Sequence, residues 1–164
     1  MENETKPRFN YTGYATQGKR YSNNLGIADI AKIIRKELKE KYPACTFSTT
    51  IQKYSGGQSL HLALMSAPFE VFNTEHKQDK NGNIYTDRDY GYAQLNKYQF
   101  KEYADGYNNG AYLTKEAYEV VRAAADLANS FNYDDSDAQI DYFHCNFYLN
   151  INIGKWDKPF AKIN

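Results

Sequence analysis

The chain has 164 residues, 41% of them hydrophobic, which is enough for one domain with a substantial core and too little for two. Its formal net charge is zero, so no overall field draws it to nucleic acid or to an anionic membrane. No apolar run approaches the roughly 20 residues of a membrane span, and the N-terminus lacks a signal-peptide core. We therefore expect a cytoplasmic protein.

Residues 1–24 show no hydrophobic periodicity, and we expect them to be a flexible N-terminal arm in front of a single α+β domain at 25–164. From Ile27 apolar residues recur at helical spacing, and Pro43 disfavours helical geometry at the residue before it. This predicts an amphipathic helix over 27–42. Its outer side carries four cations: Lys32, Arg35, Lys36 and Lys39.

A strand hairpin is predicted directly after this helix. Apolar residues alternate with polar ones over 45–54 and again over 58–65, the period of half-buried strands. Gly56 and Gly57 lie between the two segments, and glycine reaches the positive φ values that tight hairpin turns need.

A polar, tyrosine-rich insertion is predicted at about 73–112, with a candidate strand from Tyr92 to Phe100. Thr114 then offers an N-cap for a second amphipathic helix over 114–131. After a short acidic connection, strict alternation over 143–153 predicts a strand that is central in the sheet.

Together these elements predict a two-layer α+β fold of order α-β-β-insertion-α-β. Two helices pack on one face of an antiparallel sheet of three or four strands, and the opposite face stays polar. Cys45 and Cys145 both fall on the apolar side of a strand pattern, so we expect two buried thiols and no disulfide.

No catalytic constellation is visible, so we expect a protein that is not an enzyme and needs no cofactor. The histidines have no metal-type spacing, although His61 and His144 are both predicted on the polar side of the sheet. Four carboxylates between the second helix and the last strand lack the glycine and closing glutamate of a calcium loop. We predict no metal there.

The segment Ile27-Ala-Asp-Ile-Ala-Lys-Ile-Ile-Arg-Lys-Glu-Leu38, with Tyr42-Pro43 and Tyr54-Ser-Gly-Gly-Gln-Ser59 after it, resembles the large polyvalent protein associated domains of phages and conjugative elements. The resemblance covers about residues 27–68. Parts of the segment from Asn132 to Phe160 are similar to small accessory proteins of Gram-positive mobile elements. Such a resemblance implies a protein that travels with mobile DNA in a bacterial host cell and helps its establishment, sometimes by countering host defences.

The preferred hypothesis is a stoichiometric anti-defence inhibitor, directed at a CRISPR or restriction complex, that binds a host protein. Aromatic side chains commonly carry interface energy, and carboxylates suit the basic grooves of nucleic-acid enzymes. The predicted contact residues are Tyr90, Tyr92, Tyr98, Tyr103, Tyr107, Asp134, Asp135, Asp137 and Asp141.

An alternative hypothesis is a nucleic-acid-binding accessory protein. In it the cations Lys32, Arg35, Lys36 and Lys39 contact phosphates while tyrosines of the insertion stack on bases. A simple solvated helix face would show the same four cations, so the sequence leaves this alternative open.

Overall fold

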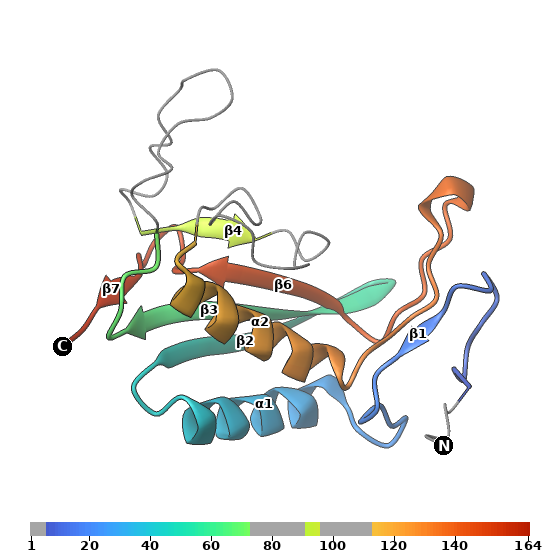
Figure 1. Ribbon diagram of the computed structural model, residues 1–164. Helices are drawn as coiled ribbons and strands as arrows, with labels where there is room; N and C mark the ends of the chain where they lie inside the picture. The colour runs from blue at the N-terminus through green and yellow to red at the C-terminus, as the bar shows by residue number, and fades with distance from the viewer. Residues whose placement is uncertain (1–5, 73–90, 96–112) are drawn as a thin grey trace.

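The computed structural model describes residues 6–72, 91–95 and 113–164 (Figure 1). Its elements, in chain order, are β1 (Thr16–Gln17), α1 (Ile27–Lys41), β2 (Thr46–Tyr54), β3 (Gly57–Ala67), β4 (Ala93–Leu95), α2 (Lys115–Asn129), β5 (Tyr133–Asp134), a short 3-10 helix (Ala138–Ile140), β6 (Tyr148–Ile153) and β7 (Ala161–Lys162).

Both helices form where the sequence predicts them. The apolar stripe of α1 is buried along its whole length, and α2 begins at Thr114, whose hydroxyl oxygen accepts a hydrogen bond from the Ala117 N–H at 3.3 Å. This bond satisfies one of the free donors at the helix start. The hairpin between β2 and β3 is confirmed as well, since Gly56 in its turn has a φ of +86°.

The two helices lie on one face of the main sheet and share a single core with it (Figure 1). Alternate residues of β3 and β6 face the helices, and the largest fully buried side chains include Phe131, Phe147 and Ile34. The predicted two-layer α+β architecture with both helices on one face is therefore confirmed.

The sheet is mixed, and the prediction of a purely antiparallel sheet is wrong in this respect. The strand order is β2-β3-β6-β4, with β7 beside the far end of β3. β2 and β4 run antiparallel to their neighbours, but β6 runs parallel to β3. The reason is that α2 returns the chain across the helical face to the end of the sheet where β3 begins, so the next strand enters in the same direction.

The predicted strand over 143–153 is shorter than its alternating pattern suggests. β6 spans Tyr148–Ile153 and is central, between β3 and β4, as expected. Before it, Phe143 is 53% exposed and Cys145 is half-buried, because this part of the chain pairs with residues 133–137 instead of with the sheet. Neither cysteine is the fully buried thiol expected, since Cys45 is also half-buried; neither forms a disulfide.

Residues 6–24 make contacts that the expectation of a flexible arm did not include. β1 pairs antiparallel with β5, and the Gly18 N–H donates to the Asn132 carbonyl at 2.8 Å. Within the insertion, the candidate strand at Tyr92–Phe100 is present as β4, which is confined to Ala93–Leu95 among the described residues.

Truncating Phe147 and truncating Phe143 should have opposite consequences, although both residues occupy equivalent places in the alternating pattern. Phe147 is 1% exposed, so Phe147→Ala should lower the free energy of unfolding by about 3–5 kcal/mol. Phe143→Ala, the matched control at an exposed site, should change it by less than about 0.5 kcal/mol. Denaturant titrations of the two variants measure this difference. Equal effects would contradict the finding that Phe147 is buried in the core while Phe143 lies outside the sheet.

Candidate protein-binding surface

Residues 132–147 form a hairpin that projects from the main sheet, here called the acidic hairpin (Figure 1). Its two sides are joined by backbone hydrogen bonds, including Asp135 N–H to the His144 carbonyl at 2.8 Å and Asp137 N–H to the Tyr142 carbonyl at 2.7 Å. At the tip, Asp137 caps the short 3-10 helix by accepting a hydrogen bond from the Gln139 N–H at 2.9 Å.

The base of the acidic hairpin is tied to the core by two asparagine side chains. The Asn132 amide donates to the Phe147 carbonyl at 3.0 Å and accepts from the Phe147 N–H at 3.2 Å. The Asn146 amide donates to the Phe131 carbonyl at 3.0 Å. Because both phenylalanines are buried, these bonds fix where the hairpin leaves the domain.

The N-terminal segment, residues 8–18, lies along the acidic hairpin and is held there by one carboxylate. Asp135 is only 1% exposed and accepts hydrogen bonds from the Tyr11 N–H at 2.6 Å, the Thr12 N–H at 3.0 Å and the Thr12 hydroxyl at 2.6 Å. Burial by itself would raise the pKa of Asp135, but these three bonds favour the charged form and hold its pKa below the usual value.

Aromatic rings line the contact between the same two segments. Phe9 packs against His144 and Tyr133, with ring centroids 4.6 and 4.9 Å away, and Tyr11 packs against Tyr142 at 4.9 Å. Offset and edge-to-face arrangements of this kind add to the stability of the contact. This role was not predicted from the sequence. The one pattern that could have indicated it is that Phe9 and Tyr11 are two positions apart, the period of a strand.

Large apolar side chains remain exposed on both segments. Four aromatic or aliphatic side chains are between 53% and 80% exposed: Tyr11, Tyr14, Ile140 and Phe143. We call this set the apolar hairpin surface. Exposed groups of this kind, carried on a segment that is itself fixed by internal bonds, are typical of protein-binding sites.

The four predicted carboxylates do not act as one surface. Asp135 is buried and bonded internally, Asp137 caps the tip, and Asp134 lies in β5 with one carboxylate oxygen buried and unpaired among the described residues. Only Asp141 is exposed, in a left-handed conformation with φ of +55°. Within the ranges that the structure describes, no three histidine, cysteine or acidic side chains gather as metal ligands.

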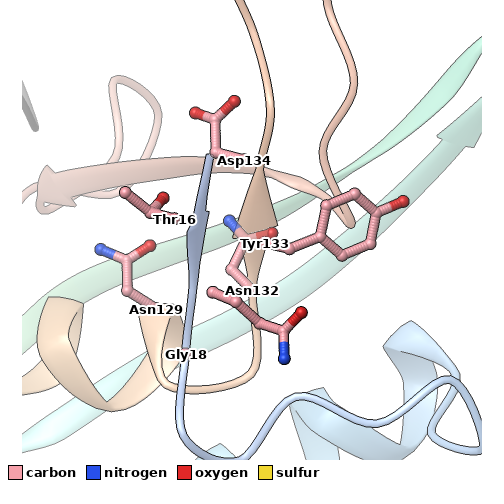
Figure 2. Close-up of a pocket in the computed structure, with 7 residues that line it drawn as sticks. Thr16, Gly18, Asn129, Asn132, Tyr133 and Asp134 are labelled. Carbon is pink, nitrogen blue, oxygen red and sulfur yellow. The ribbon is translucent and has the colours of Figure 1, made fainter. Parts of the chain in front are cut away.

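A pocket of about 380 Å³ lies where the N-terminal segment crosses the base of the acidic hairpin (Figure 2). Thr16, Asn129 and Asp134 lie on one side of the β1–β5 pair, and the Tyr133 ring points to the other. A side chain at Gly18 would collide with the carbonyls of Asn129 and Ser130, which explains the need for glycine at this crossing.

Four of the remaining predicted residues lie outside the described part of the chain: Tyr90, Tyr98, Tyr103 and Tyr107. Tyr92 lines a hollow on the sheet face away from the helices, together with His61, whereas His144 belongs to the acidic hairpin. The two histidines are therefore not brought together on one polar face.

The basic side of α1 is only partly available to a ligand. Arg35 donates from Nε and Nη2 to the Thr49 carbonyl, at 3.1 and 2.8 Å, and so joins the helix to the edge strand β2. Lys36 lies 4.0 Å from Glu40, and Lys32 and Lys39 are exposed. All four predicted cations are thus exposed, but Arg35 is engaged by the Thr49 carbonyl and has a structural role.

A family model, Large polyvalent protein associated domain 29, matches residues 25–126, more than half of the chain. The chain belongs to this family. Membership confirms the resemblance predicted from the sequence and places the chain among the accessory proteins of mobile elements. The match runs from α1 through the tyrosine-rich insertion into α2, and it leaves the acidic hairpin and the N-terminal segment outside.

Neither a curated protein nor a solved structure matches the chain. Over the described residues, no helix has the length and apolar character needed to cross a membrane.

Removing the charge of Asp135 should release the N-terminal segment. Because the pKa of Asp135 is lowered in the folded protein, its contribution is present above the ordinary aspartate value of 3.8 and is lost as the pH falls through the lowered value. In wild type, the protection of the Tyr11 and Thr12 amides against hydrogen exchange, relative to the intrinsic exchange rate at each pH, should therefore be high at pH 6 and be lost in strong acid. Asp135→Asn should make this protection low at both pH values.

Asp141→Asn provides the control, since that carboxylate is exposed and bonds no residue of the N-terminal segment described here. Unchanged exchange of the Tyr11 and Thr12 amides in Asp135→Asn would contradict the proposed attachment.

Proposed function

We propose that this protein is a non-enzymatic accessory protein of a mobile element that binds a host protein stoichiometrically and inhibits a CRISPR or restriction complex. The observation that carries the proposal is the apolar hairpin surface, in which Tyr11, Tyr14, Ile140 and Phe143 are exposed on two segments locked together. The family supplies the mobile-element setting.

The way in which this surface is held favours recognition of a folded partner. An interface gains affinity when its apolar anchors are already ordered, because little conformational entropy is then lost on binding. The Asp135 bonds and the ring contacts of Phe9 order the two segments before any partner arrives. The exposed Asp141 beside the tip adds a negative charge that suits a basic surface, such as one that handles nucleic acid.

The acidic hairpin lies outside the part of the chain that the family model matches, whereas most of the scaffold lies inside it. The matched residues end within α2, before the hairpin begins. A contact surface carried outside the shared scaffold would allow related proteins to keep one fold and engage different partners. We therefore assign partner choice to residues 132–147 and the N-terminal segment.

The test is an interference assay in a bacterial host that carries an active CRISPR or restriction system. Expression of the protein should restore transformation by a targeted plasmid, and with the purified defence complex inhibition should saturate near one protein per target. The double variant Ile140→Ala/Phe143→Ala should weaken binding about tenfold or more, the usual effect of removing central apolar anchors.

A matched control is Lys32→Gln/Lys39→Gln, which changes two exposed cations on α1 and leaves the acidic hairpin intact. It should inhibit like wild type. One protein molecule disabling many target complexes would instead reveal an enzymatic activity and contradict the proposal.

The alternative of nucleic-acid binding makes a different prediction for the same proteins. Affinity for single-stranded DNA would fall steeply with salt, since each phosphate contact releases counterions, and it would be lost in Lys32→Gln/Lys39→Gln. The bond from Arg35 to Thr49 makes this alternative the weaker one, because the most specific phosphate-binding side chain of the four is already engaged.

A further inference from the structure

The sheet face away from the helices carries uncharged polar side chains in aligned rows. Thr50, His61 and Asn150 lie side by side on β2, β3 and β6. In the next row, Ser48 on β2, Asn152 on β6 and Gln94 on β4 flank the small Ala63. A groove of about 390 Å³ follows these rows and is closed on one side by the turn after β6.

Within the residues that the structure describes, the hydrogen-bonding side chains in the middle of this groove have no partner. At the hairpin end of the same face, Tyr54 bonds Ser59 at 2.9 Å. In the middle rows, by contrast, the side chains of Thr50, His61 and Asn152 make no hydrogen bond within the described part of the chain, and His61 Nε2 is buried without a partner. Groups that can both donate and accept are thus left free along the groove.

Trp156 is held at the rim although it is 83% exposed. It lies in a tight turn closed by reciprocal hydrogen bonds between the backbones of Lys155 and Lys158, at 2.9 and 3.1 Å. Gly154 anchors the turn through its N–H to the Leu64 carbonyl at 2.8 Å, and its φ of +60° suits glycine. The turn therefore presents a large aromatic ring to solvent beside the groove, which Tyr92 also lines.

We propose that this groove binds a single nucleobase, carried by a free nucleoside or mononucleotide. A planar base stacks on an exposed indole ring, and its edge has donors and acceptors that amide side chains such as Asn152 match. The lining is too polar for a purely apolar ligand, because hydroxyl and amide groups would be left without partners.

The charges around the groove favour one base over a strand. Lys155 is the cation among its lining residues, and Asp157 in the same turn offsets it. A polynucleotide needs several cations along its path to replace counterions, whereas a nucleoside needs none and a mononucleotide needs one. This site lies on the sheet and the turn after β6, apart from the acidic hairpin, so it stands or falls independently of the proposed function (Figure 1).

The sequence contains one tryptophan, so tryptophan emission, excited at a wavelength that the 16 tyrosines do not absorb, reports on this groove in the whole protein. Adenosine, cytidine and adenosine monophosphate are titrated into the full chain, with methyl glucoside and a ten-nucleotide oligothymidine as further arms. We expect saturable quenching by at least one nucleoside or by the mononucleotide, little change with salt for the nucleoside, and no response to the glucoside.

Variants then locate the site. Asn152→Ala and Gln52→Ala should each weaken the apparent affinity about tenfold, the effect of losing one well-placed hydrogen bond. Gln52 also lines the groove and is exposed, so its variant stays informative if the half-buried Asn152 is needed for folding. Trp156→Ala, measured by calorimetry, should abolish binding, and Tyr14→Ala, which removes an exposed ring on the N-terminal segment, should leave it unchanged.

Three results would overturn the assignment. One is the absence of saturable quenching by every nucleoside and by the mononucleotide. Another is equal quenching by methyl glucoside, which would mean that any ring with hydroxyl groups suffices. The third is binding by the oligothymidine alone with a steep dependence on salt, which would make the groove part of a strand-binding surface.

Discussion

The parallel pairing of β3 with β6 requires the chain to cross from one end of the sheet to the other between these strands. α2 makes the last part of that crossing on the face that α1 already covers, so both helices pack against the same alternate residues of the two central strands. Two of the largest core side chains lie where this crossing ends: Phe131 follows α2, and Phe147 precedes β6. Because both phenylalanines are buried, the residues between them have to leave the domain and return to it.

That departure explains the acidic hairpin. The residues before Asn146 cannot extend β6 along β3, since the register that pairs Ser59 with Tyr148 places them beyond Gly57, where β3 begins. Backbone groups that leave a sheet need other partners. The hairpin supplies some of them by pairing with itself, and the N-terminal segment supplies others through the pairing of β1 with β5. The Asp135 carboxylate in turn accepts hydrogen bonds from backbone N–H groups of that segment. The exposed rings on these segments are thus the outer side of an assembly whose inner side is held by these hydrogen bonds and by the ring contacts of Phe9.

The same topology separates two kinds of surface. On the acidic hairpin, exposed apolar side chains are carried together with the exposed carboxylate of Asp141, while Asp135 and Asp137 are engaged in internal bonds, and this combination suits a folded partner. On the sheet face away from the helices, uncharged donors and acceptors are lined up by strand pairing beside one aromatic ring, which suits a small planar ligand. Arg35 has a structural use in this scaffold. By bonding the Thr49 carbonyl it covers part of the exposed edge of β2, an edge that could otherwise pair with another chain.

By itself the sequence determined the helices, the β2–β3 hairpin and the family, because these depend on neighbours close in the chain: the apolar stripe from Ile27, the cap at Thr114 and the glycines of the turn. Its period of two also identified which face of β6 is buried. Such a period does not reveal which strand lies beside β6 or in which direction that strand runs. The parallel pairing with β3 was therefore decided only by the crossing of α2. Nor could it show that Phe143 and Cys145 pair with the segment near Asp135 instead of with the sheet. Asp135 itself was predicted as a partner contact, yet its bonds to Tyr11 and Thr12 span more than 120 residues of sequence, and contacts at that separation exist only once the whole chain has folded.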